Sequence, residues 1–267
     1  MKILIFILLA TELCFSQQNP GAKQIALSNS DIAVSDNVFA LFSNPAGLGQ
    51  LKWREIGAFY SPSPFGLSEL SNAYAAYSEP FGFGSIAIGA MTYGFELYRE
   101  NKLALGVSYL YGDNFYLGAA INYKNVSIKK YGSKNTFIFD FGFLVILPGH
   151  LHLGFSYKNI TRNSFGQNTD ELPVTFQTGV SYQPINNLKV SLAVEKDIRY
   201  KASPSFGIDY RIIKNVAIRS GISTEPSKYS FGIGIFYSII NFNYAVFTHQ
   251  ELGLTHQADI IFSFGKK

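Results

Sequence analysis

The sequence predicts an all-β protein, a transmembrane antiparallel up-and-down β-barrel of about 14 strands with a short N-terminal plug. Three observations lead to this fold class. From Arg54 onward, apolar side chains alternate with small or polar ones at a period of two. The composition combines 24 Gly, 24 Phe and 17 Tyr with only 15% charged residues. No stretch after the N-terminal leader has the apolar length of a membrane-spanning helix.

Residues 1–16 are predicted to be a cleaved secretory signal peptide. Met1-Lys2 supplies the basic start, Ile3 to Ala10 the apolar segment, and Cys14-Phe15-Ser16 a small-residue cleavage site before Gln17. The apolar run is too short to cross a bilayer as a helix. We therefore expect the chain to be exported.

Cys14 is the only cysteine in the chain. The preceding Thr11-Glu12-Leu13 lacks the small residue that is expected before a lipidated cysteine. We therefore expect Cys14 to leave with the leader, and lipid attachment is the alternative. A mature chain without cysteine has no disulfide framework and no thiol chemistry.

Residues 17–52 are predicted to form a hatch inside the barrel. Asn44-Pro45 predicts a turn, because Pro45 fixes its own φ and disfavours the helical region for Asn44. Gly47 and Gly49 permit close backbone approach. Ser35 to Phe42 is mostly apolar and can pack as a helical or turn-like plug. Taken alone, the segment also fits a surface turn that caps a soluble domain.

Residues 53–267 are predicted to form the barrel itself. One face of each alternating run is apolar and the other is rich in Gly, Ala, Ser and Asn, which is typical of half-buried strands. The predicted strands cover residues 54–61, 69–79, 82–94, 99–111, 115–129, 135–147, 150–160, 172–183, 187–197, 203–212, 215–224, 228–239, 241–249 and 255–264.

The connections between these runs are predicted to alternate in length. Six short turns, expected on the periplasmic side, fall at residues 79–82, 112–114, 147–150, 183–187, 213–215 and 238–241. The intervening connections are generally longer and more polar, at residues 61–68, 95–100, 129–135, 161–171, 197–202 and 250–254. Short periplasmic turns and longer external loops are typical of outer-membrane barrels.

Tyrosines near the predicted periplasmic turns indicate an interfacial ring. They are Tyr77, Tyr111, Tyr182, Tyr210 and Tyr237, each near the end of a strand that runs toward a short turn. Tyrosine is enriched at membrane interfaces because its ring is apolar and its hydroxyl is polar. A soluble β-barrel with its apolar face inward is the main alternative, and it has less reason to place tyrosines at one level.

Polar side chains on the predicted inner face are the candidate functional residues. They are Lys124, Asp140, His152, Lys189, Glu195, Asp209, Arg211 and Arg219. Inside a barrel such groups are usually solvated or mutually paired. Asp209 and Arg211 share a face and could pair with Arg219 on the adjacent strand, or contact the hatch at the amide of Asn44.

Other chemistry receives no support from the sequence. The net charge of +4 is dispersed, so nucleic acid is not an expected partner. The histidines lack metal-ligand spacing, and neither a Gly-x-Ser-x-Gly turn nor a phosphate-binding loop is present. We therefore expect no enzymatic activity, no catalytic residues, no metal and no cofactor.

The hatch motif resembles that of the FadL-like outer-membrane superfamily. Within that superfamily the chain is most similar to the PorV/PorQ group, which is associated with type IX secretion. The resemblance rests on Asp-x-x-x-Ala-x-x-x-Asn-Pro-Ala-Gly-Leu soon after a leader, and implies a bacterial outer-membrane barrel of 14 strands around an N-terminal hatch. The residues that match are Asp36, Ala40, Asn44, Pro45, Ala46, Gly47 and Leu48.

Two functions follow from this resemblance. As a PorV/PorQ-like protein, the barrel would be a component of type IX secretion or would dock cargo or other envelope proteins. As a FadL-like transporter, it would move long-chain fatty acids or other small hydrophobic compounds across the outer membrane. Both imply contact with outer-membrane lipid. An open apolar path through the lumen favours transport, and a closed lumen with an exposed apolar rim favours docking.

Overall fold

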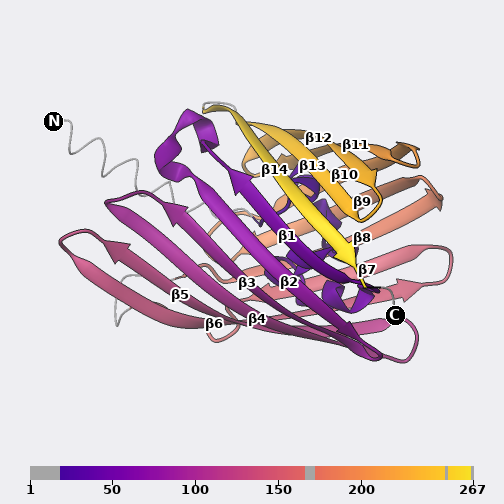
Figure 1. The fold of residues 1–267 in the computed structure, drawn as a ribbon, viewed down its shortest axis with the longest axis horizontal. Helices are drawn as coiled ribbons and strands as arrows, with labels where there is room; N and C mark the ends of the chain where they lie inside the picture. The colour runs from indigo at the N-terminus through magenta and orange to yellow at the C-terminus, as the bar shows by residue number, and fades with distance from the viewer. Residues whose placement is uncertain (1–18, 166–171, 250–251, 266–267) are drawn as a thin grey trace.

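The computed structural model describes residues 19–165, 172–249 and 252–265. The predicted leader, residues 1–16, lies outside the described residues, as do parts of the predicted connections at 161–171 and 250–254. The described chain consists of a short N-terminal segment followed by strands (Figure 1).

The strands form one closed antiparallel barrel in sequence order, and β1 pairs with β14 to close it. The predicted barrel of about 14 strands is therefore confirmed. The strands are β1 (Arg54–Ser61), β2 (Asn72–Phe81), β3 (Gly84–Gly94), β4 (Tyr98–Tyr111), β5 (Phe115–Ile128), β6 (Gly132–Leu147), β7 (Leu151–Lys158), β8 (Thr175–Ile185), β9 (Leu188–Asp197), β10 (Ser203–Ile213), β11 (Val216–Thr224), β12 (Ser227–Tyr237), β13 (Ile240–His249) and β14 (Gly253–Phe264).

Some connections differ from those expected. Between β1 and β2, the predicted strand start at residue 69 is wrong, because Glu69 and Leu70 belong to the short helix η6 (Ser68–Leu70). This helix follows η5 (Pro64–Gly66) within the connection, and β2 begins at Asn72. The connection predicted at 129–135 is shorter, because Gly132 to Asn135 continue β6 and pair with β5. Strands β11 and β12 are joined by Glu225 and Pro226 alone. The six predicted short turns all lie at one end, which we call the short-turn end; the opposite end is the mouth.

The outer surface of the barrel is apolar. Along β4, for example, Leu103, Leu105 and Val107 are 50–60% exposed and alternate with buried Ala104 and small inward residues. Large apolar residues occupy the same outward positions on the other strands. An exposed apolar belt that surrounds a closed barrel is the surface of a protein embedded in lipid.

The predicted tyrosine ring lies on this outer surface. Tyr111, Tyr182, Tyr210 and Tyr237 are exposed, and Tyr77 is partly buried and donates a hydrogen bond to Glu79. All five lie on strands that run toward the short-turn end. Their hydroxyl groups can therefore reach the interface while their rings contact lipid.

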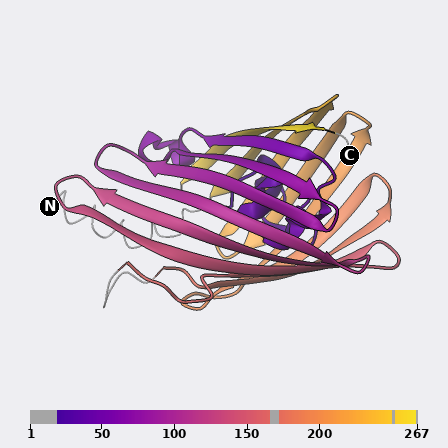
Figure 2. The same cartoon turned by 60° about the horizontal axis from the view of Figure 1, so that its bottom comes forward.

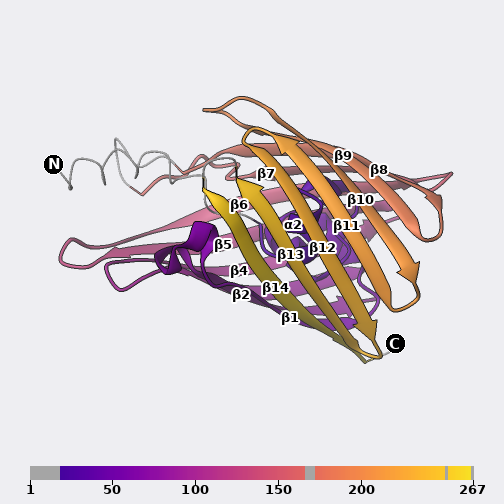
Figure 3. The ribbon, with the colours of Figure 1, turned by 90° about the horizontal axis from the view of Figure 1, so that it is seen from above.

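Residues 19–51, which we call the hatch, lie inside the barrel (Figures 2 and 3). The hatch consists of α2 (Ala22–Ala26), η2 (Ser30–Ala33), η3 (Val38–Phe42) and η4 (Pro45–Gln50), and nearly all of its residues are buried. No helix within the described residues is long and apolar enough to cross a membrane.

Candidate functional site

The hatch motif is centred on the buried side chain of Asn44. Its amide nitrogen donates to the carbonyl oxygens of Ile32, at 3.0 Å, and Phe143, at 3.2 Å. Its amide oxygen accepts from the backbone nitrogen of Ala46, at 3.2 Å. The first bond joins two turns of the hatch and the second joins the hatch to β6. Asn44 therefore fixes the position of the hatch as well as its local turn.

The residues after Asn44 form a tight turn of helix. Asn44 itself is extended, with φ of −132° and ψ of 100°, and Pro45 begins η4. The side chains of Ala46 and Leu48 are completely buried. Gly47 packs directly on the backbone of Ser35, where an added Cβ would overlap the carbonyl oxygen. Each motif residue from Asn44 to Leu48 thus contributes to the backbone geometry or to the packing of this turn.

Ala40 and Asp36 have different surroundings within the motif. Ala40 lies in η3 and is completely buried. Asp36 lies between η2 and η3 and forms ion pairs with Lys23 of the hatch and Lys189 of β9, the latter at 3.4 Å. Asp36 is therefore the charged member of the motif and connects the hatch to the barrel wall.

Small residues of the barrel wall surround the hatch at one level. On ten strands a glycine faces the hatch so closely that an added Cβ would press on hatch atoms. We call these residues the glycine belt: Gly57, Gly89, Gly106, Gly118, Gly142, Gly154, Gly179, Gly207, Gly221 and Gly232. The register continues the belt through alanines on three further strands, Ala76, Ala193 and Ala245. The glycine belt therefore allows hatch backbone to lie directly against barrel backbone.

A polar network ties the hatch to the short-turn end of the wall. Asp209 pairs with Arg219, at 3.2 Å, and lies 4.0 Å from Lys23. Arg219 also donates to Asn243, at 2.7 Å, which in turn donates to Asp259, at 2.7 Å. The network ends on the hatch, because it includes the bond from the backbone nitrogen of Ala22 to Asp259, at 2.6 Å.

The charged groups of the hatch have shifted pKa values. Burial opposes ionisation of Asp36, but Lys23 and Lys189 outweigh it and lower the pKa of Asp36 well below its usual range. Burial also disfavours the charged form of Lys23, yet Asp36 and Asp209 raise its pKa above the ordinary value. Burial raises the pKa of Asp31 to about 6. At neutral pH the hatch thus retains the Lys23–Asp36 ion pair.

The predicted lumen residues do not form one site. Asp209, Arg211 and Arg219 lie near the short-turn end, where Asp209 pairs with Arg219 as considered from the sequence. The suggested contact of Asn44 with Asp209 or Arg211 is wrong, because Asn44 bonds to Ile32 and Phe143 instead.

The other predicted lumen residues lie apart from that group. Asp140 lies nearer the mouth and accepts from Asn122 and from the backbone of Asn159, both at 2.9 Å. Glu195 lies on β9 opposite Gln177 and Ser203. His152 faces inward near the start of β7. Lys124 pairs with Glu100, at 2.9 Å.

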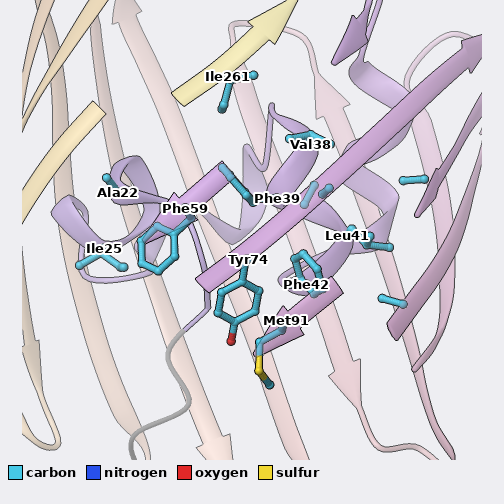
Figure 4. Close-up of a cluster of buried hydrophobic side chains, with 14 of the residues drawn as sticks. Ala22, Ile25, Val38, Phe39, Leu41, Phe42, Phe59, Tyr74, Met91 and Ile261 are labelled. Carbon is cyan, nitrogen blue, oxygen red and sulfur yellow. The ribbon is translucent and has the colours of Figure 1, made fainter. Parts of the chain in front are cut away.

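On the mouth side of the hatch, buried aromatic side chains pack together and onto the hatch inside the barrel, and we call them the aromatic lining; Figure 4 shows several of them. At the mouth, Phe65 of η5 packs on Phe247, with ring centroids 5.8 Å apart. Deeper, Tyr74 contacts both Phe59, at 5.9 Å, and Phe42 of the hatch, at 5.1 Å. These residues belong to one buried apolar cluster that extends from the mouth into the hatch.

The fold matches solved β-barrel structures over nearly the whole chain. The TodX monoaromatic hydrocarbon channel, as a deltaS2 mutant, has a TM-score of 0.72, with 13% identity, 95% of this chain and 100% of that chain covered. The toluene transporter TodX of P. putida has a TM-score of 0.66, with 13% identity, and coverage of 92% and 99%. This chain shares their barrel fold.

A FadL homologue from Pseudomonas aeruginosa gives a similar result. Its TM-score is 0.62, with 11% identity, 92% of this chain and 97% of that chain covered. No family model and no curated protein matches the sequence. The structural matches therefore support the FadL-like part of the predicted resemblance at the level of the fold, and none of the three is described as a PorV or PorQ protein.

Sequence reasoning missed several members of the polar network. Asn243 and Asp259 are direct cross-strand partners on the inner face, and both are buried. The period of two could have found them, because Asp259 falls opposite the apolar positions Ala258 and Ile260. Lys23 had no such signal, since it lies in a short helix before the first strand.

Proposed function

We propose that this protein is a FadL-like channel of the bacterial outer membrane that admits small hydrophobic compounds, with passage controlled by the hatch. The observation that carries the proposal is the aromatic lining between the mouth and the hatch, where Phe65, Phe247, Phe59 and Tyr74 lead to Phe42. Similarity of fold to TodX, described as a toluene transporter, adds support.

The aromatic lining suits an apolar solute. Moving apolar surface from water to such a wall is favourable by roughly 25 cal/mol per Å². Small apolar ligands commonly bind in concave sites lined by aromatic and aliphatic side chains. Because these side chains are buried against one another, the proposed ligand enters at the mouth by displacing them and then moves toward Phe42 of the hatch.

The glycine belt implies that passage needs movement of the hatch. Gly118 faces the backbone of Ala46, and Gly154 faces Ala33 so closely that an added Cβ would lie 2.5 Å from its Cα. With hatch and wall in contact at this level, a solute crosses only after part of the hatch shifts. A change of a short segment between an ordered and a displaced state is a common way to switch a protein between two states.

The proposed location follows from the outer surface and the leader. An apolar belt around a closed barrel needs a bilayer, and residues 1–16 predict export. In such barrels the short turns face the periplasm. We accordingly propose that the short-turn end is periplasmic and that the mouth faces the cell exterior.

The test is a reversible lock between the hatch and the wall. The hydroxyl oxygens of Ser28, in the hatch, and Ser230, on β12, are 3.0 Å apart. The double variant Ser28→Cys/Ser230→Cys would allow a disulfide there, and the expected mature chain has no other cysteine. A matched control is Ser181→Cys/Ser191→Cys, whose hydroxyl oxygens are also 3.0 Å apart but join β8 to β9.

Uptake of toluene into proteoliposomes is measured with each variant oxidised and reduced. We expect the oxidised Ser28/Ser230 variant to lose uptake and to recover it on reduction, while the control pair transports in both states. Uptake that persists with the hatch locked would reject the hatch as the gate. Absence of uptake by the wild-type protein would reject the channel itself.

Docking of secretion-system or cargo proteins, in the manner of PorV/PorQ, is the second candidate. It is favoured by the close fit of the hatch, because the glycine belt seats it against ten strands. A barrel that stays closed under all conditions is a scaffold. No solute uptake by the wild type, together with conductance after deletion of residues 24–50, would support this candidate over the channel.

A further inference from the structure

A polar cavity of about 480 Å³ lies beneath the hatch at the short-turn end. We call it the vestibule. Its walls come from the hatch and from the short-turn ends of several strands, including β1, β8, β9 and β10. The aromatic lining described above lies on the other side of the hatch, so the vestibule is separate from it.

Cationic side chains exceed carboxylates in the vestibule. Four cations line it, Lys23, Lys189, Arg211 and Arg219, against the three carboxylates Asp36, Asp209 and Glu55. Both aspartates are already engaged, Asp36 by the two lysines and Asp209 by Arg219. With Glu55 counted as the third negative charge, the four cations leave the vestibule with one positive charge in excess.

That charge belongs to Arg211. Within the part of the chain that the structure describes, no carboxylate lies within 4.0 Å of its guanidinium, which stacks over Phe236 at 4.6 Å from the ring centroid. Arg211 is exposed, and it lines the cavity. Phe236 covers one face of the guanidinium and leaves its N–H edge for a ligand.

The strand register changes at this same place. Among the strand pairs of the described barrel, the register shifts at two points, between Arg211 and Ile213 on β10 and between Tyr182 and Ile185 on β8. Gln183 lies within the register shift on β8, and it also lines the vestibule. Bulges commonly occur beside functional sites, where they redirect a side chain. Both irregularities thus shape one cavity.

We propose that the vestibule binds small organic carboxylates, with Arg211 as the principal anchor. The planar guanidinium matches a carboxylate in a two-bond geometry, and Lys189 and the Gln183 amide line the same space. Trp53 and Phe236 provide apolar surface for the body of the ligand. This binding does not depend on the proposed channel activity, because the vestibule is exposed without movement of the hatch.

The test uses Trp53, the only tryptophan of the chain, as the reporter. Mature protein in a neutral sugar detergent is titrated with 4-nitrobenzoate, an anionic quencher, and with uncharged 4-nitrobenzyl alcohol. We expect saturable quenching of Trp53 by the carboxylate and only linear quenching by the alcohol. Titration calorimetry with benzoate gives a second measurement that does not depend on fluorescence.

Variants assign the binding to Arg211. In Arg211→Gln we expect the half-saturating concentration to rise about tenfold, because a charge-assisted pair is lost. The matched control is Lys214→Gln, an exposed cation in the next turn that does not line the cavity, and we expect no change. Heat-dependent gel migration checks that both variants are folded.

Three outcomes would overturn the proposal. Equal quenching by the acid and the alcohol, without benzoate heat, shows that no carboxylate site exists. Unchanged binding in Arg211→Gln shows that Arg211 is not the anchor. An equal loss in Lys214→Gln shows attraction to general positive charge and not a built site.

Discussion

Gly118 of β5 lies against the backbone of Ala46 in the hatch, and a Cβ added to Gly118 would lie 2.6 Å from the Cα of Ala46. Ordinary carbon contacts are about 3.5–4.0 Å, so even a methyl group does not fit. The neighbouring backbone cannot move away cheaply, because Asn44 holds it by hydrogen bonds to Ala46, Ile32 and Phe143. The glycine is required by contact with the hatch.

The first prediction concerns this contact. We expect Gly118→Ala to destabilise the seated hatch by about 1–3 kcal/mol through overpacking. Urea unfolding in detergent and trypsin cleavage after the buried Lys23 measure the effect. The control is Gly82→Ala, since an added Cβ there meets nothing within 4 Å. Equal behaviour of the two variants would contradict the proposed role of the glycine belt.

The second prediction concerns the charge state at Asn44. In Asn44→Asp an acceptor replaces the nitrogen that faces the carbonyls of Ile32 and Phe143. We expect a loss of about 2–5 kcal/mol, larger than for Asn44→Ala, because two buried acceptors then face a third.

The urea concentrations at the unfolding midpoints of Asn44→Asp and Asn44→Ala test this prediction. Asn215→Asp is the matched control, since Asn215 also donates to a carbonyl, that of Phe236 at 2.7 Å, but in an exposed turn. We expect little change there. If Asn44→Asp is no worse than Asn44→Ala, the donor role of the Asn44 amide is refuted.

The third prediction concerns pH. Burial raises the pKa of Asp31 to about 6, although Lys23 acts in the opposite direction. The folded protein therefore favours the protonated carboxyl. Its contribution is fully present below about pH 4 and is lost as the pH rises through 6, by at most about 3 kcal/mol.

We thus expect the wild type to lose more stability than Asp31→Asn between pH 5 and pH 8. The temperature at which the folded gel band disappears measures this. Asn stays neutral throughout, so the difference between the two proteins isolates Asp31 from other titrating groups. Identical slopes for both proteins would show that Asp31 is not the source.

The fourth prediction concerns the buried pair of Arg219 and Asp209. Arg219→Gln leaves Asp209 with a weak contact to Lys23, at 4.0 Å, and we expect a loss of about 3–5 kcal/mol. Adding Asp209→Asn should restore part of that loss, because the uncompensated charge disappears.

An exposed pair supplies the comparison. Lys129 and Glu96 form an ion pair near the mouth with 47% and 79% of their side chains exposed. Lys129→Gln should cost less than about 1 kcal/mol in urea unfolding, because solvent screens the pair. A similar cost for Arg219→Gln would mean that the hatch network contributes little.

The sequence predicted the wall of the barrel well because each strand repeats a local pattern. Leu103, Leu105 and Val107 alternate with Ala104 and Gly106, and this alternation alone assigns their faces. Short turns with Gly, Pro or Asn marked the strand ends at one side. The mouth was less predictable, because Ser133 and Asn135 are polar yet continue β6 by pairing with β5.

The interior was predicted less completely. The period of two places Asp209 and Arg219 inside, and their adjacent strands make the pair foreseeable. The alternation does not show how far along the barrel axis each inward residue lies from the hatch. For that reason the sequence alone groups Asp140 with Arg211, although the structure places only Arg211 in the vestibule. The high glycine content is visible in the sequence, but the sequence does not show that ten of the glycines surround the hatch.

Closure of the barrel joins the first strand to the last, and the hatch bonds to that last strand through Ala22 and Asp259, which are 237 residues apart in the sequence. The bond between Ala22 and Asp259 can therefore form only when β14 is in place. Seating of the hatch and closure of the wall are thus coupled, because the strand that closes the barrel also carries the carboxylate that holds the start of the hatch.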